Sequence, residues 1–351
     1  MFPGRLVKTA SGLLAAGVGL VGIGGPFLSG WLIDTWSFRG AFWFMAIVVA
    51  VVLLLQVLFV PESPVREPAT RFDYLGGILL GGGLTAAVYA IGQGPSWGWT
   101  GGKTLAFLVG AVLALLLFGF VESRVEQPLL PLALIRRRRV WSVLLATSVA
   151  AAAVYAVGTV TQLLQLMPTI PAVSGGLGWS VTKSAVVGAP LSIVVIVVAI
   201  FAGRLARRFD TRVLLGLGAV LAAAGFAVAA QYHHGVWQFI MFGLIAGPGF
   251  GLIVATMPIM IVESVAPREQ SLANGSQWLV QGVFQLVFTQ AIFTVMAHRG
   301  TVLEGTQFYH DSGFRNGFIA VVICLVVAAV LVPLIPKADR ALDADLGSQA
   351  D

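Results

Sequence analysis

Ten apolar stretches, each about as long as a lipid bilayer is thick, dominate this chain of 351 residues. A membrane-spanning helix needs roughly 20 mostly apolar residues. Only 10% of the residues are charged and the mean hydropathy is +0.93, whereas a soluble domain carries about a quarter charged residues. We therefore predict an all-α fold, a polytopic membrane protein of about ten transmembrane helices. The stretches cover residues 11–33, 41–60, 75–91, 105–121, 140–166, 184–202, 213–230, 237–261, 272–297 and 317–335.

The basic residues alternate between the two sides of the predicted membrane. Sixteen of the 21 Lys and Arg residues lie in one set of loops and in the two termini, and five lie in the opposite loops. Because the side richer in Lys and Arg is cytoplasmic, we predict a multi-pass protein of the cell (plasma) membrane with both termini cytoplasmic. The same asymmetry accounts for the net charge of +6, so we predict no nucleic-acid partner.

Two segments of the chain match known local patterns, the first typical of close helix packing and the second of a basic loop. Residues 17–30, GVGLVGIGGPFLSG, place small residues at helical spacing around a proline, a pattern that lets another helix approach closely. Residues 203–212, GRLARRFDTR, combine a glycine suited to a tight turn with basic residues that would face an acid. Generic helix packing and a plain basic cytoplasmic loop are the alternatives for the two segments.

These segments resemble motifs of the major facilitator superfamily. The first is similar to the antiporter motif in the fifth span of its drug exporters, and the second to its cytoplasmic loop motif. Further resemblances follow in chain order: WSFRGAFWF at 36–44, PES at 61–63, DYLGG at 73–77, QPLLPLALIRRRRVW at 127–141 and TQLLQ at 161–165. The antiporter-like positions are Gly22, Gly25, Pro26 and Gly30, and the loop-motif positions are Gly203, Arg204, Arg208 and Arg212.

In their order and spacing the motifs resemble the fourteen-span drug:proton antiporter branch, with the first four spans absent. The resemblance implies a partial major facilitator fold in four parts. Residues 1–62 would be a two-span remnant of the N-terminal bundle, and residues 63–134 two extra linker spans. Residues 135–336 would form the six-helix C-terminal bundle, and residues 337–351 a cytoplasmic tail.

The resemblance also implies a function and a set of partners. We expect proton-coupled efflux of hydrophobic or cationic drugs or toxic compounds by alternating access. The expected partners are a small-molecule substrate, protons and the lipid bilayer, with the missing N-terminal half or another subunit to complete the transport cavity. An N-terminally truncated inactive product is one alternative. An exporter of an endogenous lipid, siderophore or metabolite is another.

Polar residues within the predicted spans are candidates for a substrate path. Four of them recur every fourth residue in the stretch 272–297, and three more follow helical spacing in the stretch 140–166, with a glutamine near its end. Because lipid is costly for so many polar groups, we expect these faces to meet protein or a cavity. Hydrogen bonding between helices is the alternative to a substrate path. The residues are Tyr155, Thr159, Gln162, Gln165, Gln277, Gln281, Gln285 and Thr289.

Titratable residues are absent from the middle of the predicted spans. Asp34 and Glu263 lie at span ends, and Asp73 is most simply a helix N-cap. In the family that the chain resembles, the proton-carrying carboxylate is commonly on the early spans. The chain also has no catalytic constellation and no phosphate-binding glycine loop, so we predict a protein that is not an enzyme and has no cofactor.

The four histidines lie in the predicted external loops, at positions 233, 234, 298 and 310. The adjacent pair has the chemistry to bind a metal ion. Exposed histidines in loops usually bind none, so we predict no metal site.

Overall fold

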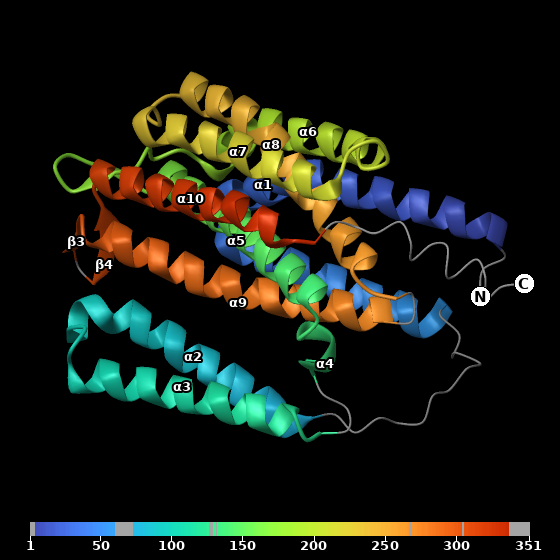
Figure 1. Ribbon diagram of the computed structural model, residues 1–351. Helices are drawn as coiled ribbons and strands as arrows, with labels where there is room; N and C mark the ends of the chain where they lie inside the picture. The colour runs from blue at the N-terminus through green and yellow to red at the C-terminus, as the bar shows by residue number, and fades with distance from the viewer. Residues whose placement is uncertain are drawn as a thin grey trace, which may run out of the picture.

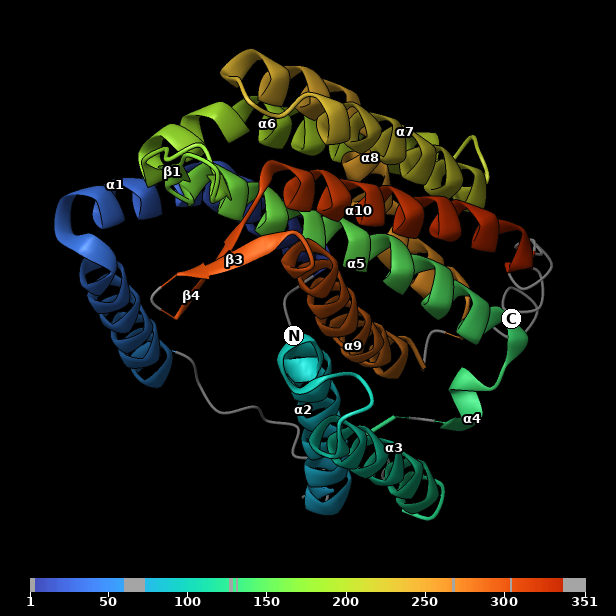
Figure 2. The same ribbon diagram turned by 90° about the vertical axis from the view of Figure 1, so that its left-hand side faces the viewer.

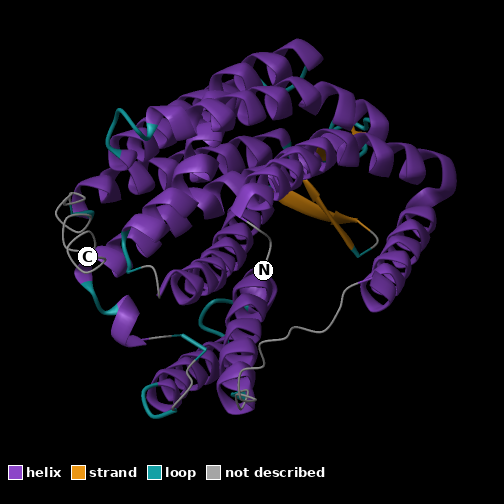
Figure 3. Cartoon of the chain, turned by 90° about the vertical axis from the view of Figure 1, so that its right-hand side faces the viewer, coloured by secondary structure: helices purple, strands orange, loops and turns teal. Residues whose placement is uncertain are grey.

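The computed structural model describes residues 4–59, 73–125, 129–130, 132–266, 269–303 and 305–336, with side chains from position 21 except 23. Long helices make up nearly all of it, and the few strands are short (Figure 3). The predicted connector 61–71, Gln127 and the tail 337–351 lie outside these residues. The helices are α1 (Gly4–Phe59), α2 (Tyr74–Trp97), α3 (Gly102–Glu122), α4 (Leu132–Ile135), α5 (Arg138–Leu166), α6 (Val181–Leu205), α7 (Thr211–Gln231), α8 (Val236–Glu263), α9 (Gln270–Ala297), α10 (Asp311–Leu331) and the 3₁₀ turn η2 (Val332–Leu334).

The all-α prediction is confirmed. The described part of the chain contains nine helices long and apolar enough to cross a membrane, against about ten predicted stretches. The difference lies in α1, which contains both of the first two stretches. Ser37 interrupts that element with a left-handed backbone (φ 62°), and the helix turns sharply within this region, as Figure 2 shows.

Six helices from α5 to α10 pack into one bundle (Figure 1). Helix α5 is the most buried of the candidate spans, with α9 and α10 packed along it. Helix α8 lies between α6 and α7. A buried core runs through this bundle, and its largest fully buried side chains include Phe226, Phe314 and Phe318.

Small residues bring helices α7 and α8 together. A β carbon at Gly249 would lie 2.4 Å from the Ala222 backbone nitrogen, and one at Gly225 would lie 2.6 Å from that of Ala246. Contacts this short leave no space for any larger side chain. Without a hydrophobic driving force between helices in lipid, such close backbone approach is a main source of their association.

Helices α2 and α3 form an antiparallel hairpin outside the six-helix bundle, against α9. The predicted N-cap at Asp73 is confirmed, because its carboxylate accepts a 2.8 Å hydrogen bond from the amide of Gly76. On the α9 side of the contact, the hydroxyl of Thr294 donates to the carbonyl of Ile91 at 3.4 Å. A second bond of this hydroxyl, to the Gln290 carbonyl at 2.9 Å, lies within α9.

Two short antiparallel hairpins lie at one end of the bundle. Strands β1 (Thr169–Ile170) and β2 (Ser174–Gly175) follow α5, and β3 (Gly300–Leu303) and β4 (Thr306–Tyr309) join α9 to α10. The second hairpin lies between the predicted stretches 272–297 and 317–335. Gly300 pairs with Tyr309 and Leu303 with Thr306, which gives this connection an ordered backbone ladder.

Candidate functional site

The glutamine row on α9 faces protein rather than lipid over its first two turns. Gln277 and Gln281 are 4% and 3% exposed, and the row becomes half-buried at Gln285 and Thr289. Helix α5 packs along α9. Gln277 and Gln281 therefore lie in a buried contact between α9 and its neighbours, which we call the sealed contact. Gln285 and Thr289 lie in a more open part of the bundle.

The sealed contact contains a hydrogen-bonded pair, Thr147 and Gln277, that the sequence did not predict. The hydroxyl of Thr147 donates to the Gln277 side-chain oxygen at 3.1 Å. The amide nitrogen of Gln277 and the hydroxyl of Ser148 are buried without a hydrogen-bond partner among the described residues. The neighbouring Thr147 and Ser148, in an otherwise apolar helical segment, were the available sequence signal. This part of the row matches the alternative of hydrogen bonding between helices.

The polar row on α5 is placed differently. Tyr155, Thr159 and Gln162 are exposed, whereas Gln165 is 5% exposed and accepts a hydrogen bond from the Ser184 hydroxyl of α6. The structure therefore does not bring the whole row together with the α9 amides. Gln165 joins α5 to α6, whereas the other three residues lie on an exposed face of α5.

The exposed positions of α5 are unusually selective. Between positions 142 and 166 the exposed residues are Tyr155, Gly158, Thr159 and Gln162, and the others are buried or half-buried. They lie three and four positions apart and so share one face of the helix. In the second half of α5, the exposed positions therefore carry either polar side chains or, at Gly158, no side chain.

The antiporter-like motif of α1 contains one close helix contact. A β carbon at Gly30 would lie 2.9 Å from the Thr182 Cα of α6. Gly22 has no atoms near such a carbon, and at Gly25 the nearest is at 3.9 Å, in its own helix. Pro26 lies inside the helix. Of the motif's glycines, Gly30 is the one that the packing of the described residues requires.

The cytoplasmic loop motif lies at the α6–α7 junction. Gly203 is within helix α6, so the tight turn expected there is wrong. The basic residue that faces an acid is Arg212, which pairs with Asp210 at 2.6 Å and donates to the Ile335 carbonyl at 2.7 Å. Arg204 lies over the Phe201 ring, and Arg208 is exposed. Arg212 thus joins the start of α7 to the chain after α10.

A second ion pair lies at the same end of the bundle. Arg137, just before α5, donates two hydrogen bonds to Glu269, at 2.7 and 2.9 Å. The guanidinium group lowers the pKa of the Glu269 carboxyl below its usual value, since its hydrogen bonds and charge favour the ionised form. The pair links the start of α5 to the start of α9.

Two groups of titratable residues were not predicted from the sequence. Glu122, at the end of α3, is 2% exposed and lies beside Asp73, since both carboxylates approach Gly76. His233 lies in the connection between α7 and α8, but it is 1% exposed, so its predicted exposure is wrong. It lies beside His234 and Asp311. Both groups join residues far apart in the sequence, which no spacing pattern reveals.

Comparison with known proteins gives the family. A model of the Major Facilitator Superfamily matches residues 1–289. The chain is 30% identical over 313 residues to the probable actinorhodin transporter of Streptomyces coelicolor, which covers 83% of this chain and 51% of that protein. It is 28% identical over 316 residues to the tetracenomycin C resistance and export protein of Streptomyces glaucescens, covering 85% and 54%.

A third relative is the multidrug resistance protein Stp of Mycobacterium tuberculosis, 28% identical over 253 residues that cover 72% of this chain and 45% of that protein. The chain thus spans about half the length of the curated relatives it matches. Its helical architecture and the family match agree with the resemblance found in its motifs. This chain belongs to the major facilitator superfamily, a family of transporters rather than enzymes.

Proposed function

We propose that this chain takes part in exporting hydrophobic or cationic drugs or toxic compounds from the cytoplasm in exchange for protons. Family membership supports transport, and the relatives named for multidrug resistance, for tetracenomycin C export and as a probable actinorhodin transporter support this substrate class. The proposed setting is the plasma membrane, with both termini cytoplasmic, on the evidence of the basic loops.

The observation that carries the proposal is the polar face of α5. Between positions 142 and 166 the other residues of this helix are buried or half-buried, and the open face presents Tyr155, Thr159 and Gln162. Polar groups within a membrane span usually face a bundle interior or a water-filled cavity rather than lipid. We assign this face, with the half-buried Gln285 and Thr289 of α9, to the substrate path.

Transport by alternating access needs a second helical bundle opposite this face. The helical segment 38–59 of α1 supports such a partner, because none of its residues is buried against the described protein. Trp43 is 71% exposed and Phe59 is 74% exposed. We propose that a second bundle, from this protein's own N-terminal half or from another subunit, packs on this segment and carries the proton-binding carboxylate.

Efflux of a cationic dye from bacterial cells that produce the chain together with the second bundle, as one longer chain or as a separate subunit, tests this proposal. We expect efflux above that of cells with an empty vector, and its loss when a protonophore removes the proton gradient. Combined Thr159→Val and Gln162→Leu substitutions should slow efflux. Gln231→Leu, at the end of α7 and outside the α5 face, is the matched control.

The same efflux assay also tests the polar row of α9. Replacing Gln285 with Leu and Thr289 with Val should also slow efflux. Unchanged export by this variant would remove the row from the path. No efflux from cells whose membranes contain normal amounts of both the chain and the second bundle would overturn the function proposed for it.

A further inference from the structure

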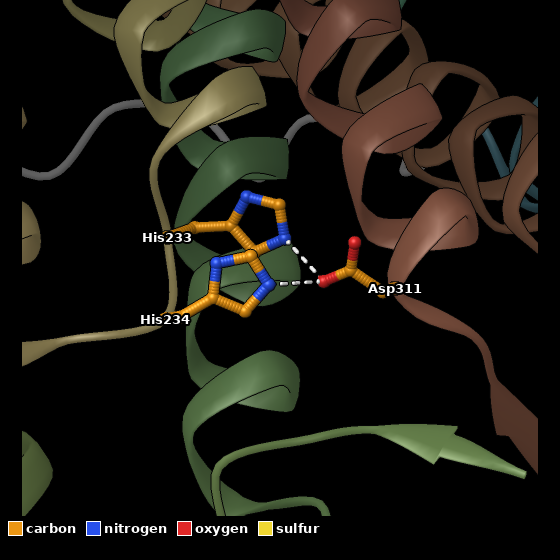
Figure 4. A group of neighbouring side chains, drawn as sticks. All are labelled: His233, His234 and Asp311. Atoms are coloured by element: carbon orange, nitrogen blue, oxygen red, sulfur yellow. Dashed lines mark hydrogen bonds and ion pairs between the residues drawn. The ribbon is translucent and has the colours of Figure 1, made fainter. Parts of the chain in front are cut away.

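Three potential metal ligands converge where α7 ends and α10 begins. The side chains of His233, His234 and Asp311 point toward one another from two chain segments (Figure 4). One Asp311 oxygen lies 3.0 Å from the Nε2 atom of His233 and 2.7 Å from that of His234. All three ligand atoms lie within 4.8 Å of one another.

The hydrogen bonding of His233 leaves one ring nitrogen aimed at Asp311. Its Nδ1 atom lies 2.8 Å from the carbonyl oxygen of Ala229, which can only accept, so Nδ1 carries a proton. Its Nε2 atom faces the Asp311 carboxylate at 3.0 Å. A cation shared between these two groups, either a proton or a metal ion, joins them.

The contact with Ala229 is also the arrangement typical of histidine bound to a metal. Such a histidine usually donates its second ring N–H to a carbonyl or carboxylate, which fixes the tautomer and the orientation of the ring. His233 is further held by the Phe318 ring, with centroids 5.6 Å apart, and by the stacked ring of His234 at 4.6 Å. One ligand is therefore oriented in advance.

The other two ligands leave the cluster open to solvent. The side chains of His234 and Asp311 are 58% and 52% exposed. The backbone of the histidine loop is held by Gln238, whose side-chain oxygen accepts from the amides of His234 and Gly235 at 2.7 and 3.1 Å. An ion can thus enter from water, and a water molecule can complete its coordination.

Two imidazole nitrogens and one carboxylate oxygen suit zinc and neighbouring first-row metals, whereas calcium and magnesium prefer oxygen ligands alone. In a tetrahedral zinc site with bonds of about 2.0–2.1 Å, the ligand atoms lie roughly 3.3 Å apart. Relative to this spacing, the Asp311 oxygen would move away from the His233 and His234 nitrogens by about 0.3 and about 0.6 Å, and these two nitrogens lie within 4.8 Å of each other. We propose that His233, His234 and Asp311 bind one zinc ion and thereby join the end of α7 to the start of α10.

Calorimetric titration of the purified chain with Zn²⁺ tests the site, independently of transport. The protein should carry no polyhistidine tag and should be treated with a chelator first. We expect one ion per chain and an affinity at least about tenfold weaker in His234→Ala and in Asp311→Asn. His298→Ala removes an exposed histidine at the same end of the bundle, outside the cluster, and should leave the affinity unchanged.

The two test substitutions change half-exposed side chains, and thermal unfolding without metal checks that both variants fold. Zinc should then raise the unfolding temperature of the wild type more than that of either variant. Absence of saturable zinc binding would overturn the proposal. Equal affinity in the wild type and both cluster variants would overturn it too, as would an equal loss in His298→Ala.

Discussion

The carboxylate of Asp34 in α1 accepts a 2.8 Å hydrogen bond from the backbone amide of Thr182, 148 positions later in the chain. It also accepts from the amide of Val181 at 3.1 Å. These amides belong to the first turn of α6, where backbone N–H groups have no partner within the helix. One turn before Asp34, Gly30 brings the two backbones into contact. A glycine and a carboxylate thus attach the first half of α1 to the six-helix bundle.

We predict that Gly30→Val destabilises the folded protein. The added side chain would collide with the Thr182 backbone, and such overpacking typically costs about 1–3 kcal/mol. Thermal unfolding of the purified protein in one detergent measures the effect. Gly22→Val is the matched control, since that position of the same motif has open space around it. Equal destabilisation by the two substitutions would contradict the packing role of Gly30.

We predict that the Arg137–Glu269 pair makes stability depend on pH in the acidic range. Because the pair lowers the pKa of Glu269 in the folded state, it stabilises the protein above the carboxyl group's ordinary pKa. That contribution disappears as the pH falls through the lowered pKa. Unfolding temperatures measured from about pH 6 to about pH 3 should therefore fall more steeply for the wild type than for Glu269→Gln.

The Arg137→Gln variant tests the same ion pair from its basic partner. It should flatten the same pH dependence, and adding Glu269→Gln to it should change little more, because the pair is already broken. Additive effects of the two substitutions would show that the residues act independently.

We predict that the polar face of α5 is in contact with water. In a Cys324→Ala background, a cysteine at Thr159 should react rapidly with a water-soluble maleimide, because the thiolate forms only where water can reach it. A cysteine at the buried Gln281 should react slowly. Val197→Cys, an exposed apolar position of α6, is the reference for a lipid-facing site. If Thr159→Cys reacts as slowly as Val197→Cys, the face meets lipid.

We predict that the chain end is cytoplasmic and the β3–β4 hairpin is not. The basic loops place Asp351 on their own side and Gly305 on the opposite side. A reporter enzyme that is active only outside the cytoplasm should therefore be inactive after Asp351 and active when inserted at Gly305. The reverse pattern would invert the topology.

The sequence alone was sufficient for the fold class and the family. Apolar stretches of spanning length must become helices in lipid, because every backbone polar group needs a partner within the membrane. The N-cap at Asp73 was equally local, since a capping side chain reaches only the next turn of its own helix. Motif order was enough to predict the superfamily match over residues 1–289.

Only the tertiary structure decided which polar residues form contacts between helices and which remain exposed. Helical spacing grouped Tyr155 with Gln162 and Gln277 with Gln285, but spacing cannot tell whether a face meets a neighbouring helix. Packing buried Gln277 against Thr147 and left Gln162 exposed. In the same way, Asp311 meets His233 across 78 positions because α7 and α10 lie side by side. Such contacts depend on how separate helices pack, and that information is not contained in any single segment.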